Sequence, residues 1–158
     1  MISQKARYSF KALIALARAA PGETVQTRQI AEQENIPRAF LEQILLELKR
    51  NRLVTSRRGK EGGYFLSRSP EEISIGQVLR VTDGPIAPLS CLSRHSYRRC
   101  EDCPDEIACA LRAGFAEAFT AQLEVLEKIS LASAMRHAEE AKANGATQEM
   151  ELYMGAGI

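Results

Sequence analysis

The four cysteines of the chain lie within nineteen residues, from Cys91 to Cys109. Their spacing is Cys91-x8-Cys100-x2-Cys103-x5-Cys109. Thiolates are soft ligands that select zinc, copper(I) or iron–sulfur clusters, and four cysteines is the usual count for either common iron–sulfur cluster. The cluster of thiols therefore indicates a cofactor site or a redox switch.

Three interpretations of these cysteines remain open at this point. An iron–sulfur cluster would use them as ligands, and structural zinc would need all four in a tetrahedron, although the C-x2-C spacing typical of zinc occurs once. A thiol–disulfide switch, with no metal, needs a lowered thiol pKa, which Arg98, Arg99 and Arg112 could provide. His95 is an outside candidate for a ligand, since lone loop histidines are mostly solvated. No catalytic arrangement is evident, so we expect that the protein is not an enzyme.

Charge is divided unevenly along the chain. Residues 1–68 contain 13 Lys and Arg against 6 Asp and Glu, whereas residues 69–158 contain 8 against 14. A basic first half predicts an anionic partner. No segment approaches the ~18–20 apolar residues of a membrane span, and the apolar run at 12–17 is shorter than the ~7–15 residues of a signal-peptide core. We expect a cytoplasmic protein that does not bind membranes, and in that compartment clustered cysteines are more often ligands or sensors than structural disulfides.

The elements before the cysteines predict a winged helix-turn-helix over residues 1–68. Apolar spacing predicts helices over 2–19, 28–34 and 37–50, followed by two short strands, 53–56 and 64–67. Between the strands, Gly59, Gly62 and Gly63 are expected to permit the positive φ angles of a hairpin. The fold class is therefore mainly α, with a small β-hairpin wing.

The remaining residues are expected to form four segments. These are a connecting helix at 69–84, a cysteine-bearing sensor loop at 85–109, a long dimerisation helix at 110–142 and a flexible tail at 143–158. The apolar seam of the long helix is Phe115, Phe119, Leu123, Leu126 and Ile129, supported by Val125 and Met135. We expect this seam to meet a second copy of the chain, because the first domain is too small to cover it. The alternative is that it packs on its own N-terminal domain.

A helix-turn-helix with a basic glycine hairpin is typical of proteins that bind double-stranded DNA. The third helix would enter the major groove, where Arg38 could reach a guanine or a phosphate, Gln43 an adenine and Glu42 a cytosine. The basic wing tip would reach a neighbouring minor groove or the phosphates. The candidate DNA-binding residues are Arg28, Arg38, Glu42, Gln43, Arg57, Arg58 and Lys60.

The run FLEQILLELKRNRLVTSRRGKEGGYFLSRSPEEISIGQVLRVTDG resembles the Rrf2 family of bacterial transcription regulators, which includes the IscR, NsrR, RirA and CymR types. The resemblance covers about residues 1–140. It implies a homodimeric winged-helix protein, here expected to be a repressor, that binds a pseudo-palindromic operator. In the iron–sulfur members, a loop before the long helix holds a 2Fe-2S or 4Fe-4S cluster through three cysteines.

The resemblance favours Cys91, Cys103 and Cys109 as cluster ligands. Cys100 is an additional thiol that could be the fourth ligand or replace Cys103. The histidine that IscR-type proteins place three residues after the last cysteine is Arg112 here, and the acid that NsrR-type proteins carry near the start of the first helix is absent. Two alternatives stay open: the same regulator sensing through thiols or a small effector without a cluster, and a zinc-stapled protein-interaction module with no DNA role.

Overall fold

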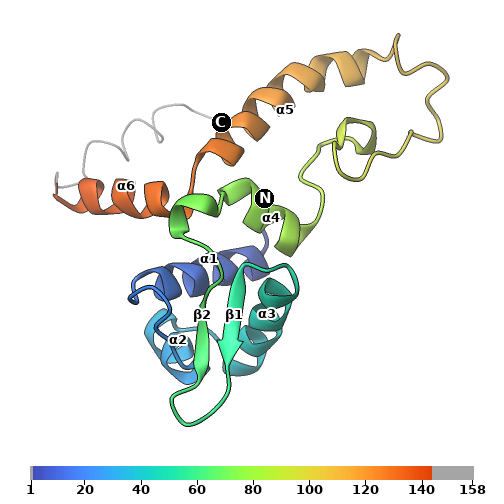
Figure 1. The fold of residues 1–158 in the computed structure, drawn as a ribbon. Helices are drawn as coiled ribbons and strands as arrows, with labels where there is room; N and C mark the ends of the chain where they lie inside the picture. The colour runs from blue at the N-terminus through green and yellow to red at the C-terminus, as the bar shows by residue number, and fades with distance from the viewer. Residues whose placement is uncertain (1, 144–158) are drawn as a thin grey trace.

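The structure, a computed structural model, describes residues 2–143 (Figure 1). It is mainly helical with one two-stranded antiparallel hairpin, which confirms the predicted fold class. In chain order the elements are α1 (Gln4–Ala17), α2 (Thr27–Glu34), α3 (Arg38–Arg50), β1 (Val54–Arg57), β2 (Gly63–Leu66), the short 3₁₀ helix η1 (Pro70–Glu72), α4 (Ile75–Asp83), a second 3₁₀ turn η2 (Ser90–Leu92), α5 (Ala110–Lys128) and α6 (Leu131–Ala143). Within residues 2–143, no helix is both long enough and apolar enough to span a membrane.

The helices α1, α2 and α3 and the hairpin form a winged domain with one apolar core. The stripe that periodicity predicts on α3 is buried, and it packs with side chains from α1, α2 and the start of β1. Burying each of these large aliphatic side chains is worth about 1.5–3 kcal/mol. The buried residues include Leu13, Ile30, Leu41, Ile44, Leu45, Leu48 and Leu53.

The hairpin pairs Val54 with Leu66 at one end and Arg57 with Gly63 at the other. The expectation of three positive φ angles is right for Gly59, with φ 114°, and wrong for Gly62 and Gly63. These two glycines are needed for space instead: a Cβ on Gly63 would lie 2.4 Å from the Val25 carbonyl oxygen. The close approach lets β2 exchange two backbone hydrogen bonds with Val25, which fixes the wing against the segment before α2.

The expectation of one continuous helix over 110–142 is wrong, because the chain breaks between α5 and α6. At the break the Ile129 carbonyl accepts a hydrogen bond from the backbone N–H of Ile75 at 2.9 Å, and the Leu131 N–H donates to the Ile73 carbonyl at 2.8 Å. These groups bond a distant segment instead of continuing the helix.

The two halves of the expected helix have different surroundings. α6 returns to the winged domain, where Leu131 is buried and Met135 packs against the core, so the alternative of packing on its own domain holds for this half. α5 projects away from the winged domain, with residues 85–109 at its far end (Figure 1). We call residues 85–109 the cysteine loop, and the loop together with α5 the arm. Beyond Ala143, the tail expected at 143–158 lies outside the described residues.

Candidate functional site

The first candidate site is a basic hollow of about 430 Å³ between the wing and the N-terminal ends of α2 and α3. Four of the predicted DNA-binding residues line it: Arg28, Arg38, Arg57 and Lys60. Glu42 and Gln43 are exposed along α3, and Arg58 is exposed at the wing tip, but none of these three lines the hollow. The fold thus brings the cations from three separate segments to one concave surface.

Two of these cations are paired within their own helices. Arg38 Nε lies 3.0 Å from Glu42 Oε1, and Arg28 Nε lies 2.7 Å from Glu32 Oε1. The hydrogen bond to Glu32 raises the pKa of Arg28, so this group stays charged. Both pairs are largely exposed, and exposed ion pairs contribute only about 0–1 kcal/mol. The guanidinium groups are therefore held in place but remain free to exchange their carboxylate partners for phosphates.

The wing is held by side-chain hydrogen bonds at its tip and on β1. Thr24 Oγ1 donates a 2.7 Å hydrogen bond to the Glu61 carbonyl at the tip, and Lys49 Nζ donates a 2.6 Å bond to Ser56 Oγ on β1. The Arg57 guanidinium lies over the ring of Phe65, 5.7 Å from its centre. The basic tip residues therefore project from a constrained hairpin.

The second candidate site is a pocket of about 290 Å³ in the cysteine loop. All four cysteines line it, together with the apolar side chains of Leu89, Pro104, Ala108 and Leu111 and with Asp102, Asp105, Glu106 and Arg112. Cys91 is buried, and the other three cysteines are half-buried, without disulfides. Residues spread over nineteen positions of the chain are thus gathered around one space, which we call the thiol pocket.

Within the thiol pocket the sulfur atoms form two pairs. Burial and a hydrogen bond to Cys91 raise the pKa of Cys100, and burial and a hydrogen bond to Cys109 raise the pKa of Cys103. Among residues 2–143, no three His, Cys, Asp or Glu side chains are already grouped in a way that could hold a metal ion. For Cys100 and Cys103 the pKa is therefore raised, whereas the sequence leads us to expect that neighbouring arginines lower it.

The arginines have a different role from the one expected. Arg99 Nη2 donates to the carbonyls of Cys103 and Pro104, at 3.1 and 2.9 Å, and Arg112 Nη1 donates to the Cys91 carbonyl at 2.7 Å. They hold the backbone of the loop and leave the sulfurs to face the pocket. Arg98 is exposed. No sequence pattern identifies these side chain–backbone bonds in advance.

Two further residues clarify the limits of the site. Cys109 is the N-cap of α5, and its sulfur accepts a 3.5 Å hydrogen bond from the Arg112 backbone N–H. His95 does not line the thiol pocket; it lines a separate small hollow beside Arg80 and Phe119. The geometry therefore gives no support to His95 as a ligand, whereas Cys109 joins the pocket directly to the first turn of α5.

A polar contact connects the arm to the connecting helix. The Glu127 carboxylate near the end of α5 accepts hydrogen bonds from Arg80 and Ser74, at the two ends of α4. The Arg80 guanidinium holds the pKa of Glu127 below its usual range. Because α4 packs in turn on α1 and α3, a continuous set of contacts runs from the thiol pocket through α5 and α4 to the third helix.

Comparison with known proteins identifies the family of this chain. The model of the Rrf2 family, described as "Iron-dependent Transcriptional regulator", matches residues 2–137. The chain belongs to the Rrf2 family. An rrf2-like putative transcriptional regulator of Rhodobacter capsulatus is 45% identical over 134 residues, which are 83% of this chain and 89% of that protein.

Solved structures of Rrf2 regulators share the fold. The global cysteine regulator CymR of Bacillus subtilis has 31% identity and a TM-score of 0.70, covering 87% of this chain and 97% of that chain. IscR of T. potens has 28% identity and a TM-score of 0.68, covering 89% and 90%. The protein is thus a winged-helix transcriptional regulator and not an enzyme, as the sequence predicts.

Proposed function

We propose that this Rrf2 regulator binds a pseudo-palindromic DNA operator as a homodimer, acting as a repressor, and that an iron–sulfur cluster in the thiol pocket controls its operator affinity. The observation that carries the proposal is the position of the pocket. It contains all four thiols, and one of them caps the helix whose other end is tied to α4.

The basic hollow supplies the DNA contacts in this proposal. The exposed face of α3, with Arg38, Glu42 and Gln43, enters the major groove, where amide and guanidinium groups can pair with base edges. Arg28, Arg57, Arg58 and Lys60 contact the phosphates beside it, and each neutralised phosphate releases counterions. DNA binding should therefore fall steeply as the salt concentration rises.

The thiol pocket fits an iron–sulfur cluster in its chemistry. Cys91, Cys103 and Cys109 would be ligands, and Cys100, which lines the same pocket, is the fourth candidate. Bound there, the cluster would supply iron that can react with oxidants and with nitric oxide. Its occupancy would follow the amount of available iron. The apolar side chains of Leu89 and Leu111 would shield the site from water, and Arg112 would keep the carbonyl of Cys91 in place.

The exposed apolar side chains of the arm support the homodimer. Leu111, Phe115 and Val125 on α5 are 64%, 47% and 55% exposed. Exposed apolar side chains along one helix are typical of a surface that a partner covers. A second copy would bury them and place two winged domains about one turn of DNA apart, as a pseudo-palindrome requires.

Anaerobic purification followed by iron and sulfide analysis tests the cofactor. We expect a coloured protein with visible absorption, and loss of that absorption in Cys91→Ser, Cys103→Ser and Cys109→Ser. Ser96→Ala, in the same loop, is the control and should keep the absorption. A colourless protein with one equivalent of zinc would contradict the proposal in favour of a zinc-stapled module.

A second candidate is a thiol–disulfide switch, and the pairing of Cys91 with Cys100 and of Cys103 with Cys109 favours it. The metal-free protein would then lose four hydrogens to a disulfide-bearing oxidant, which is reduced to its thiols. Mass spectrometry after treatment with oxidised glutathione would show two intramolecular disulfides. The thiol–disulfide switch is supported only if the anaerobic protein contains neither iron nor zinc.

DNA binding is tested with genomic fragments selected by the protein at low salt. Arg58→Ala should weaken binding and reduce the slope of log affinity against log salt by about one, as expected for the loss of one phosphate contact. Arg136→Ala, an exposed cation on α6, is the matched control and should change neither quantity. Failure to recover any fragment would contradict the DNA-binding proposal.

A further inference from the structure

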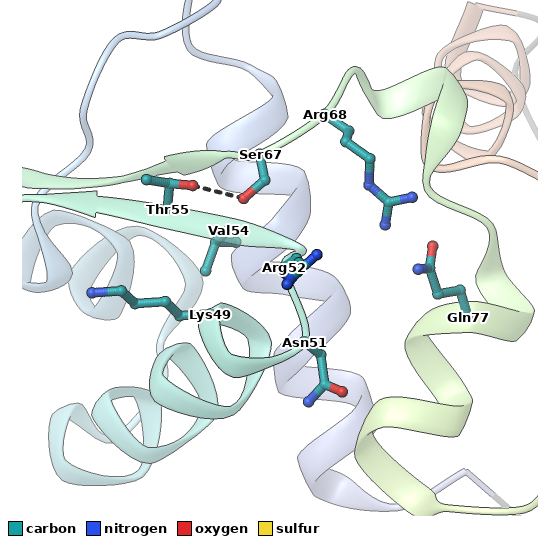
Figure 2. A pocket seen from close by; sticks show the side chains of 8 residues that line it. All are labelled: Lys49, Asn51, Arg52, Val54, Thr55, Ser67, Arg68 and Gln77. Carbon is teal, nitrogen blue, oxygen red and sulfur yellow. Dashed lines mark hydrogen bonds between the residues drawn. The ribbon is translucent and has the colours of Figure 1, made fainter.

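A second hollow, of about 650 Å³, lies at the other end of α3 from the basic hollow. It is formed by the C-terminal end of α3, the start of β1, the residues that follow β2, and the first turn of α4 (Figure 2). Its volume is within the range of about 300–1,000 Å³ that is usual for small-ligand sites. The lining residues are Lys49, Asn51, Arg52, Val54, Thr55, Ser67, Arg68 and Gln77, which include three cations and no carboxylate.

Three polar side chains of this second hollow lie around one space. In Figure 2 the guanidinium groups of Arg52 and Arg68 and the carboxamide of Gln77 surround the central space. Lys49 points toward the wing, where its ammonium donates to Ser56, so it adds positive charge at the edge. None of the ion pairs found in residues 2–143 involves Lys49, Arg52 or Arg68. The hollow therefore carries uncompensated positive charge.

The backbone at Arg52 shows that this side chain is placed there at a conformational cost. Arg52 has φ 57°, in the left-handed region that non-glycine residues seldom adopt. Its N–H donates to the Lys49 carbonyl, and the next N–H, of Leu53, donates to the Leu48 carbonyl. This pattern is the Schellman motif that ends many helices, and glycine usually occupies the left-handed position. Arg52 is exposed and lines the hollow, and a strained non-glycine residue at such a position points to a functional side chain.

We infer that the second hollow binds a small phosphate-bearing anion. Guanidinium groups match the geometry of phosphate oxygens and bind them in pairs of hydrogen bonds. Two guanidiniums and a nearby ammonium suit a ligand with two or more negative charges better than a single carboxylate. Because the volume exceeds that of free phosphate, the ligand class that fits is a phosphorylated organic molecule such as a nucleotide.

The position of the hollow favours a small ligand over a DNA phosphate. The predicted DNA contacts lie at the wing tip and at the N-terminal ends of α2 and α3, whereas this hollow lies at the C-terminal end of α3. The helix has 13 residues, which is about 20 Å. A ligand held by Arg52 and Gln77 would join the end of α3 to α4, the helix that also contacts the arm. This inference does not depend on the cofactor of the thiol pocket.

Titration calorimetry of the full chain at low salt, with inorganic phosphate, pyrophosphate and adenosine diphosphate as probes, tests the site. We expect saturable binding of pyrophosphate and the nucleotide. Arg52→Gly should weaken it at least ten-fold without lowering the thermal unfolding midpoint, because glycine relieves the left-handed strain. The matched control is Arg50→Ala, an exposed cation of the last turn of α3 that does not line the hollow, and it should leave binding unchanged.

Three results would overturn the inference. One is the absence of saturable binding for every probe. Another is an equal loss of affinity in Arg52→Gly and Arg50→Ala, which would indicate diffuse attraction to a basic surface. The last is a fall of about one in the salt slope of DNA binding in Arg52→Gly, which would assign the hollow to a DNA phosphate.

Discussion

In the winged domain most of the large apolar side chains face inward, whereas along the arm several of them face solvent. Leu13, Leu41 and Leu45 have no exposed surface, but Ile107 and Leu111 are 97% and 64% exposed. The winged domain is complete within one chain and presents a fixed basic surface. In the proposed function, a second copy would cover the exposed apolar side chains of the arm and a cluster would fill the thiol pocket. This difference suits a regulator in which one region binds DNA and the other responds.

Truncating a buried side chain in the core of the winged domain should have the largest effect on stability. Leu45→Ala should lower the free energy of unfolding by about 2–5 kcal/mol, because it leaves a cavity in a tightly packed interior. Leu46→Ala, next to it on α3 but 42% exposed, should change the free energy by less than about 0.5 kcal/mol. Urea unfolding followed by circular dichroism checks both. Similar losses for the two variants would mean that α3 is not buried on the face described.

The exposed face of the arm gives an effect on assembly instead. Phe115→Ala should raise the dissociation constant of the dimer about ten-fold or more, since each 1.4 kcal/mol of lost apolar burial is a factor of ten. Sedimentation equilibrium measures this constant. Leu46→Ala, which removes an exposed leucine from the winged domain, is the control. An unchanged dimer in Phe115→Ala would remove α5 from the interface.

Replacing a glycine by alanine should destabilise the tightly packed winged domain but stabilise the arm. In Gly63→Ala the new Cβ would lie 2.4 Å from the Val25 carbonyl oxygen, so the wing must shift. This shift should lower the free energy of unfolding by about 1–3 kcal/mol. In Gly114→Ala the Cβ meets no atom within 4 Å, and the exchange should stabilise α5 by up to about 1 kcal/mol. Thermal unfolding should therefore move in opposite directions. A stabilised Gly63→Ala would contradict the close approach of β2 to Val25.

The contact between α4 and α5 gives the smallest effect and depends on pH. Arg80 lowers the pKa of Glu127 from its usual 4.5, so the pair stabilises the fold above that pH and is lost as the pH falls through the folded-state pKa. Because the Glu127 side chain is 39% exposed, Glu127→Gln should cost only about 0.2–1 kcal/mol at neutral pH, and nothing measurable at an acidic pH below the folded-state pKa of Glu127. Urea unfolding at both pH values should show no such difference for Glu124→Gln, an exposed acid on the same helix. A cost that persists in acid would contradict the ion-pair explanation.

The winged domain could be predicted because its signals are local. The spacing of Leu41, Ile44, Leu45 and Leu48 identifies the buried face of α3 without any knowledge of its neighbours. The break between α5 and α6 could not be predicted, because it arises from backbone bonds to Ile73 and Ile75, more than fifty residues away. Apolar periodicity continues through the break and gives no sign of it.

The two candidate sites differ in the same way. The basic residues of the wing follow from the hairpin order, so their convergence could be expected. The thiol pocket could be expected as a cluster of cysteines, but not the pairing of its sulfurs or the bonds from Arg99 and Arg112 to loop carbonyls. These contacts depend on the path of a loop without periodic signals. The second hollow could not be foreseen either, since Lys49, Arg52 and Arg68 form part of a generally basic segment.

The most direct test of the account compares operator affinity with and without the cluster in the same protein. A genomic fragment selected by the anaerobic protein is titrated with cluster-loaded protein and with protein freed of iron by a chelator, at one salt concentration. We predict that the two dissociation constants differ by about 5–150-fold, the range of ordinary allosteric coupling, and that Cys91→Ser behaves like the iron-free protein. Equal affinities for the two forms would contradict the proposal that the arm controls DNA binding.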